Sequence, residues 1–135
     1  MRAIPCGFDE QGKTERQRKG NTEMWLYCKS GFFSAVQHEA DASLIHVRAR
    51  FEGDLERLCE AHGVKAAVTV TPQNDYRFRM DFPRETWAEI VREEAEGIDY
   101  PNFKNAVHDG TARDAAYLGA WCAMRAGQTS GAAGR

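Results

Sequence analysis

Four arginines and one histidine are the residues of this chain whose type and spacing most clearly suggest chemistry: His46, Arg48, Arg50, Arg77 and Arg79. They alternate with apolar residues in two segments, Leu44–Phe51 and Asp75–Phe82. Successive side chains on a strand point to opposite faces, so each segment is predicted to be a strand with its basic residues turned away from the core. If the two strands share a sheet, their guanidinium groups form one surface of planar donors that match phosphates and carboxylates. The pattern therefore predicts an anion-binding sheet face.

Two aromatic residues of an earlier segment, Trp25 and Tyr27, are predicted to add stacking surfaces to this face. Arginines beside aromatic residues on an exposed sheet are the means by which RNA-recognition-type modules hold single strands. Two structural alternatives remain open. In one, the last helix, which contains Trp121, covers the face. In the other, the arginines form cross-strand salt bridges with the acidic residues nearby, Glu52, Asp54, Asp75 and Asp81.

Familiar catalytic patterns do not occur in this sequence. It has no Gly-x-Ser-x-Gly elbow and no Gly-x-Gly-x-x-Gly loop, and Gly12-Lys13-Thr14 lacks the upstream glycine and strand of a phosphate-binding loop. His108 with Asp109 is better explained as turn chemistry than as a metal or catalytic pair. The four cysteines and four histidines are scattered. Cys28 lies on a predicted strand and Cys59 and Cys122 on apolar helix faces, so these cysteines are expected to be reduced and buried. We therefore predict no catalytic residue, no metal site and no cofactor.

Length and composition are those of one ordinary globular domain. The chain has 135 residues, a net charge of −2 and 42% hydrophobic residues, so no global field would attract nucleic acid and any such attraction depends on where the charges lie. Residues 1–23 are polar and are expected to be a disordered extension, and residues 127–135 have the composition of a flexible tail. Residues 24–126 are predicted to be a single α+β domain. No apolar run is long enough to span a bilayer and no signal peptide is seen, so a cytoplasmic location is expected.

The predicted fold is a four-stranded, largely antiparallel sheet with helices on one face. A first strand, Met24–Lys29, is expected to continue beyond a kink at Ser30-Gly31. Later elements are predicted from periodicity, capping and turn residues: a helix from Asp54 to His62, a strand over Val64–Thr71, a helix from Pro83 to Gly97 and a last helix from Thr111 to about Ala126. The order is ββαββα plus a C-terminal helix, which suggests a ferredoxin-like arrangement.

Four motifs occur in an order that resembles a group of small uncharacterised bacterial and phage-type proteins: Met24–Ser34, Val47–Arg50, Thr71–Tyr76 and Ile98–Lys104. The resemblance covers roughly residues 24–124. It implies no activity and no catalytic roles, but it draws attention to the turn that contains Tyr100, Asn102 and Lys104, which we include among the candidate binding residues.

Two function classes are expected. The first is a non-enzymatic binding module that engages single-stranded nucleic acid or an acidic protein surface through the basic sheet face. The second is a phage or mobile-element inhibitor of a host protein, with the acidic helix stripe Glu85, Glu89 and Glu93 and the turn from Tyr100 to Lys104 as its contact surface. A small hydrolase is less favoured. The sequence predicts no membrane partner and does not indicate an oligomeric state.

Overall fold

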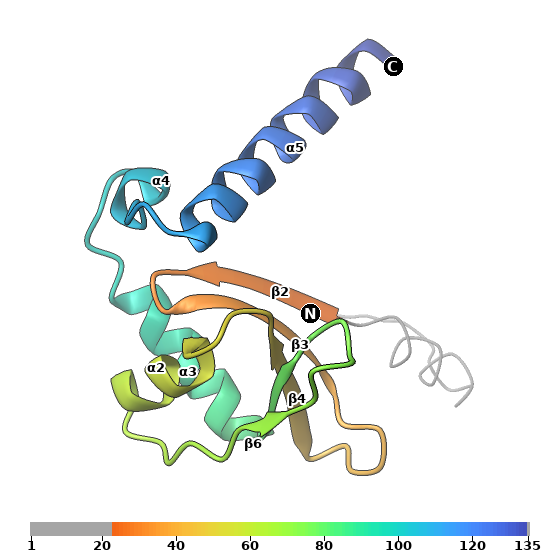
Figure 1. Ribbon diagram of the computed structural model, residues 1–135, viewed down its shortest axis with the longest axis vertical. Helices are drawn as coiled ribbons and strands as arrows, with labels where there is room; N and C mark the ends of the chain where they lie inside the picture. Colours follow the sequence, from red (N-terminus) through yellow and green to blue (C-terminus); the bar gives the residue numbers. More distant parts are fainter. Residues whose placement is uncertain (1–22, 135) are drawn as a thin grey trace, which may run out of the picture. The chain divides into compact units, whose positions relative to one another are not determined.

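The computed structural model describes residues 23–134, which form two compact units (Figure 1). Unit 1 contains residues 23–96 of the described chain, and unit 2 contains residues 97–134. The sequence predicted one domain over residues 24–126, whereas the structure divides the chain after Glu96. The predicted extension at residues 1–23 lies outside the described residues except for Glu23, which begins the first described strand.

Unit 1 is an antiparallel five-stranded sheet with two helices. Its strands are β2 (Glu23–Cys28), β3 (Gly31–Gln37), β4 (Leu44–Ala49), β5 (Thr69–Val70) and β6 (Phe78–Pro83). The order across the sheet is β2-β3-β4-β6-β5, with every neighbouring pair antiparallel. The helices are α2 (Asp54–Ala61) and α3 (Arg84–Glu96). The α+β class and the antiparallel sheet are confirmed.

The strand count of four was wrong, because the predicted kink at Ser30-Gly31 is instead the turn of a hairpin. Cys28 pairs with Gly31, and the register continues regularly from there along β2 and β3, the orange strands of Figure 1. Gly31 has φ +153°, a conformation that side-chain-bearing residues rarely adopt, so glycine lets the chain reverse at this point. The strand predicted over Val64–Thr71 shrinks to the two residues of β5. This strand order does not confirm a ferredoxin-like arrangement.

The core of unit 1 lies between one sheet face and the two helices. Alternation along β4 turns Ile45, Val47 and Ala49 into this core, as the sequence predicted. Helix α2 contributes Leu55, Leu58 and Cys59, and helix α3 contributes Trp87 and Ile90. The predicted bounds of both helices hold to within about one residue, except that Pro83 ends β6 rather than starting α3. The other sheet face lies away from both helices.

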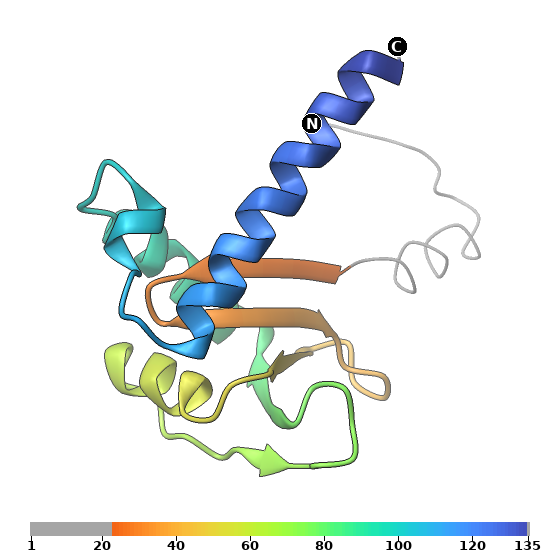
Figure 2. The same cartoon turned by 45° about the horizontal axis from the view of Figure 1, so that its top comes forward.

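Unit 2 is built from α4 (Phe103–Ala106) and α5 (Ala112–Gly134). The predicted cap of α5 is present, since the Asp114 backbone N–H donates to Thr111 Oγ1 at 3.5 Å. Helix α5 continues through the segment predicted to be a flexible tail, as Figure 2 shows. Alanines favour helix along α5, whereas each of its glycines weakens helix formation by about 1 kcal/mol relative to alanine. Along the described residues, no helix combines the length and the apolar character that crossing a membrane requires.

The cysteines differ partly from the prediction that Cys28, Cys59 and Cys122 are buried. Cys28 and Cys59 are buried in unit 1, but Cys122 is exposed on α5, and Cys6 lies outside the described residues. Burial, reinforced by the charge of Glu94, raises the pKa of the Cys28 thiol to about 12. Cys28 therefore behaves as a small apolar core residue rather than as a reactive thiol.

Candidate functional site

The sheet face opposite α2 and α3, which we call the open face, has a continuous row of polar and aromatic side chains. Strand pairing places Trp25 beside Ser34, Ser34 beside Arg48, and Arg48 beside Arg79. Directly paired residues of antiparallel strands share a face, so these four side chains cross β2, β3, β4 and β6 in one line. Trp25 is 59% exposed although it lies on a regular strand. The open face thus combines an exposed indole with two guanidinium groups.

A second row on the open face contains a hydrogen-bonded histidine. His46 pairs with Asp81 across β4 and β6, and its Nδ1 lies 2.6 Å from Asp81 Oδ1. Its Nε2 lies 3.5 Å from a terminal nitrogen of Arg79. Since a carboxylate only accepts and a guanidinium only donates, a neutral His46 that holds its proton on Nδ1 satisfies both partners. Nε2 of His38 lies 3.6 Å from the other oxygen of Asp81.

Four aromatic rings form a cluster at one end of the open face. Tyr27 stacks on Phe32 with ring centroids 4.6 Å apart, and Trp25 meets Phe32 edge to face at 6.0 Å. Tyr76 lies 6.5 Å from Phe32. Phe32 and Tyr76 are buried, whereas Trp25 and Tyr27 are exposed. The two outer rings are therefore supported from beneath and offer flat surfaces to a partner.

Tyr76 is where the predicted alternation fails. The sequence placed it on the core side with Phe78, but two guanidinium groups of the open face, those of Arg48 and Arg50, lie 4.7 Å and 4.1 Å from its ring centroid. Residues 72–76 form a turn and bends rather than a strand, so regular alternation begins at Phe78, where β6 starts. Stacking on a ring restrains each arginine in an orientation suited to a planar partner.

Carboxylates on the same face neutralise much of its positive charge. Arg50 donates to Asp75 at 2.7 Å, and this hydrogen bond lowers the pKa of the exposed Asp75 carboxyl. Arg48 donates to Glu23 at 3.1 Å. The salt-bridge alternative is thus partly realised, although Asp54 pairs with Arg57 of its own helix and not with the arginines of the face. The open face is charged but nearly balanced.

The remaining predicted binding residues lie elsewhere. Arg77 precedes β6 and has an exposed side chain. Asn102 has a structural task, since its Oδ1 accepts from the Asn105 backbone N–H at 3.1 Å and caps α4. Tyr100 contacts Phe103, and the Lys104 ammonium lies 4.9 Å from the centre of the Trp121 ring. Tyr100, Asn102 and Lys104 belong to unit 2.

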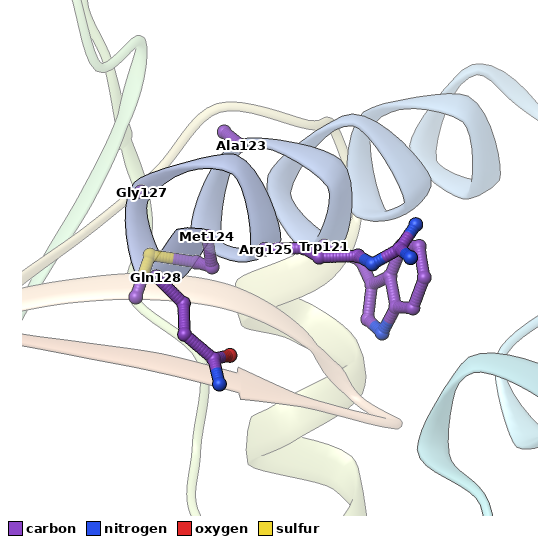
Figure 3. A pocket seen from close by; sticks show the side chains of 6 residues that line it. All are labelled: Trp121, Ala123, Met124, Arg125, Gly127 and Gln128. Carbon is purple, nitrogen blue, oxygen red and sulfur yellow. The ribbon is translucent and has the colours of Figure 1, made fainter. Parts of the chain in front are cut away.

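Helix α5 has a stripe of exposed large apolar side chains, Leu118, Trp121 and Met124. Figure 3 shows Trp121, Met124 and Arg125 projecting from this helix, and the Arg125 guanidinium lies 5.6 Å from the Trp121 ring centre. Spacings of three residues put the stripe on one side of the helix. Apolar residues at this helical spacing would favour burial, yet the three members of the stripe are exposed. Tyr117 of the same helix is buried, in a stack with Phe103 whose ring centroids lie 5.7 Å apart.

The predicted acidic stripe on α3 is partly neutralised. Glu89 is paired with Arg92, and Glu93 accepts from His62 Nδ1 at 2.6 Å. His62 Nε2 lies 2.7 Å from Glu94. Burial of His62 opposes its protonation, but the hydrogen bonds to the two glutamates outweigh burial and raise its pKa. His62 therefore joins the end of α2 to α3, and its two hydrogen bonds favour the protonated form of the ring.

Sequence reasoning missed Glu23, Ser34, Phe32 and Tyr76 as members of the open face. Glu23 was assigned to the extension, and Ser34 was treated only as part of a strand. Alternation counted from Trp25 through the correct hairpin register would have found Ser34 and Phe32. Tyr76 had no such signal because it precedes the regular part of its strand.

Within residues 23–134, no group of three or more histidine, cysteine or acidic side chains is placed to hold a metal ion. Comparison of the chain with protein-family models, with curated proteins and with solved structures gave no match. The geometry of the site is therefore the basis for assigning a function.

Proposed function

We propose that unit 1 is a non-enzymatic binding module whose open face engages an anionic partner, with single-stranded nucleic acid as the partner best suited to it. The observation that carries the proposal is the exposure of Trp25 and Tyr27 beside arginines that are stacked on Tyr76. Bases stack on flat aromatic side chains without regard to sequence, and guanidinium groups contact the phosphates between them.

Charge balance sets the expected strength of this binding. Arg48 and Arg50 already have carboxylate partners, so only part of their charge is offered to phosphates. We expect weak affinity that falls steeply with salt, because each phosphate contact releases a counterion. Stacking on Trp25 adds a contribution that salt affects less.

The test is fluorescence anisotropy of a labelled single-stranded oligonucleotide of about 12 nucleotides, titrated at several salt concentrations between about 50 and 200 mM. Arg48→Ala and Arg79→Ala should each weaken binding and reduce the salt slope by about one. Arg92→Ala removes an arginine of α3 with the same change in net charge, and it should bind as wild type does. Absence of binding by wild type at the lowest salt, or equal effects of all three variants, would exclude the proposal.

A second candidate is a regulator or inhibitor that acts through protein contacts, as phage and mobile elements encode. The apolar stripe on α5 favours it, because Met124 is 77% exposed and Leu118 and Trp121 are also exposed. Exposed apolar side chains gathered on one helix side are typical of protein-binding surfaces. A protein retained from the source cell by wild type and lost from Met124→Glu would support this candidate. Identical retention by both would count against it.

A further inference from the structure

One carboxylate oxygen on the open face accepts hydrogen bonds from three different strands. Glu23 Oε2 receives the Trp25 indole N–H at 2.7 Å, the Ser34 hydroxyl at 2.5 Å and a terminal Arg48 N–H at 3.1 Å. Trp25 lies on β2, Ser34 on β3 and Arg48 on β4, so the three donors are fixed by the pairing of the sheet. Three convergent donors, one of them cationic, are the elements of an oxyanion site.

Two of the three donors are held by contacts that do not involve Glu23. Ser34 is fully buried, and its hydroxyl oxygen accepts from Arg48 at 2.7 Å. The Arg48 guanidinium is stacked over Tyr76, and only 20% of the Arg48 side chain is exposed. The third donor, Trp25, is 59% exposed and contacts Phe32 edge to face. Glu23 lies at the start of an edge strand and has 39% of its side chain exposed. Ser34 and Arg48 are therefore fixed by their surroundings, whereas the Glu23 side chain can turn into solvent.

Glu23 also leaves the site incompletely satisfied. Among the described residues, Arg48 Nε is the buried side-chain nitrogen that has no hydrogen-bond partner. A buried donor without an acceptor costs free energy, so this guanidinium has capacity for an additional oxygen. A phosphate brings more acceptor oxygens than a single carboxylate does.

We infer that Trp25 Nε1, Ser34 Oγ and the Arg48 guanidinium form an oxyanion receptor that Glu23 occupies as an internal competitor of the ligand. The inference deepens the proposed function and rests on it for the identity of the partner, whose phosphate would displace the Glu23 carboxylate. The receptor itself is tested without that partner. The hydrogen bonds from Ser34 and Trp25 lower the pKa of Glu23, so the competitor is ionised at neutral pH.

The experiment follows the Trp25 indole N–H signal by NMR during a titration with inorganic phosphate. The Trp25→Phe variant identifies that signal among the three tryptophans of the chain. Glu23→Gln should bind phosphate about tenfold more tightly than wild type. The neutral amide competes less strongly than the carboxylate for the three donors, and a tenfold factor corresponds to the net energy of about one charge-assisted hydrogen bond. In that background Ser34→Ala should weaken binding again. The control is Glu39→Gln, which changes the net charge by the same amount at an exposed position. Its phosphate affinity should equal that of wild type.

Every outcome decides the inference. Equal phosphate affinity of wild type and Glu23→Gln, an unmoved Trp25 signal, or an equal gain from Glu39→Gln would overturn it. If Glu23→Gln failed to fold, phosphate titrations of wild type and Ser34→Ala would decide instead, because removal of one donor must weaken phosphate binding at the Trp25 signal. Phosphate binding without oligonucleotide binding would remove the proposed function and leave the receptor. Oligonucleotide binding without any effect of phosphate on the Trp25 signal would reject the receptor and leave the proposed function.

Discussion

Replacing Gly31 with alanine should destabilise unit 1 more than the same change at Gly63 does. A Cβ atom at Gly31 would lie 2.5 Å from both Cγ and Oδ2 of Asp54, and 2.9 Å from its Cβ. Asp54 is fully buried and cannot move away cheaply. Its Oδ2 accepts from the Phe32 backbone N–H at 3.3 Å, and its other oxygen is paired with Arg57.

Two costs contribute to the expected loss of stability. Forcing alanine to adopt φ +153° is strained and costs about 1–3 kcal/mol. Displacing the packed Asp54 side chain adds an overpacking cost of about 1–3 kcal/mol. The free energy of unfolding should therefore fall by about 2–6 kcal/mol, a large share of the roughly 5–15 kcal/mol typical of small domains. A loss of about 3 kcal/mol lowers the urea midpoint by about 1–3 M.

The assay is urea unfolding of the full chain, followed by far-ultraviolet circular dichroism. Gly63→Ala is the matched control, since Gly63 has φ +68° and nothing within 4 Å of an added Cβ, so it carries backbone strain without a clash. Gly63→Ala should lower the free energy of unfolding by only about 1–2 kcal/mol. If Gly31→Ala lost no more stability than Gly63→Ala, the packing of the hairpin turn against Asp54 would be refuted.

Three other features of the chain give testable expectations. Hydrogen bonds to Glu94 and Glu93 raise the pKa of His62 above its unfolded value near 6.5. The stability that these bonds give the folded state is therefore fully present below that pH and is lost as pH rises through the folded pKa. The free energy of unfolding should thus decline as pH rises above about 6.5 in wild type and stay flatter in His62→Gln, and parallel curves would contradict this. Iodoacetamide should modify Cys122 in the native protein but spare Cys28, as peptide mapping would show, and rapid native labelling of Cys28 would disprove its burial. Gly119→Ala should stabilise α5 by about 0.5–1 kcal/mol and increase its helicity, because an added methyl group meets nothing within 4 Å. A drop in helicity, measured by circular dichroism, would argue against an open helix face at this position.

Local periodicity was sufficient to predict much of unit 1. Alternation along β4 correctly placed His46 and Arg48 on the sheet face away from Val47. The same rule placed Arg79 of β6 on the face away from Met80. The start of α2 at Asp54 and the end of α3 before Gly97 also follow from short-range signals. These features depend on neighbours within a few residues, so the chain contains the needed information locally.

The composition of the open face depended on contacts between distant residues. Arg48 meets a carboxylate 25 positions away in Glu23, and its ring partner Tyr76 comes after helix α2 and strand β5 in the chain. Neither pairing follows from alternation, because strand order and the turns between strands decide which side chains become neighbours. The sequence by itself determined which residues of β4 face away from the core. Only the tertiary structure decided that three strands direct their donors at one oxygen of Glu23, since that convergence requires the register of the whole sheet.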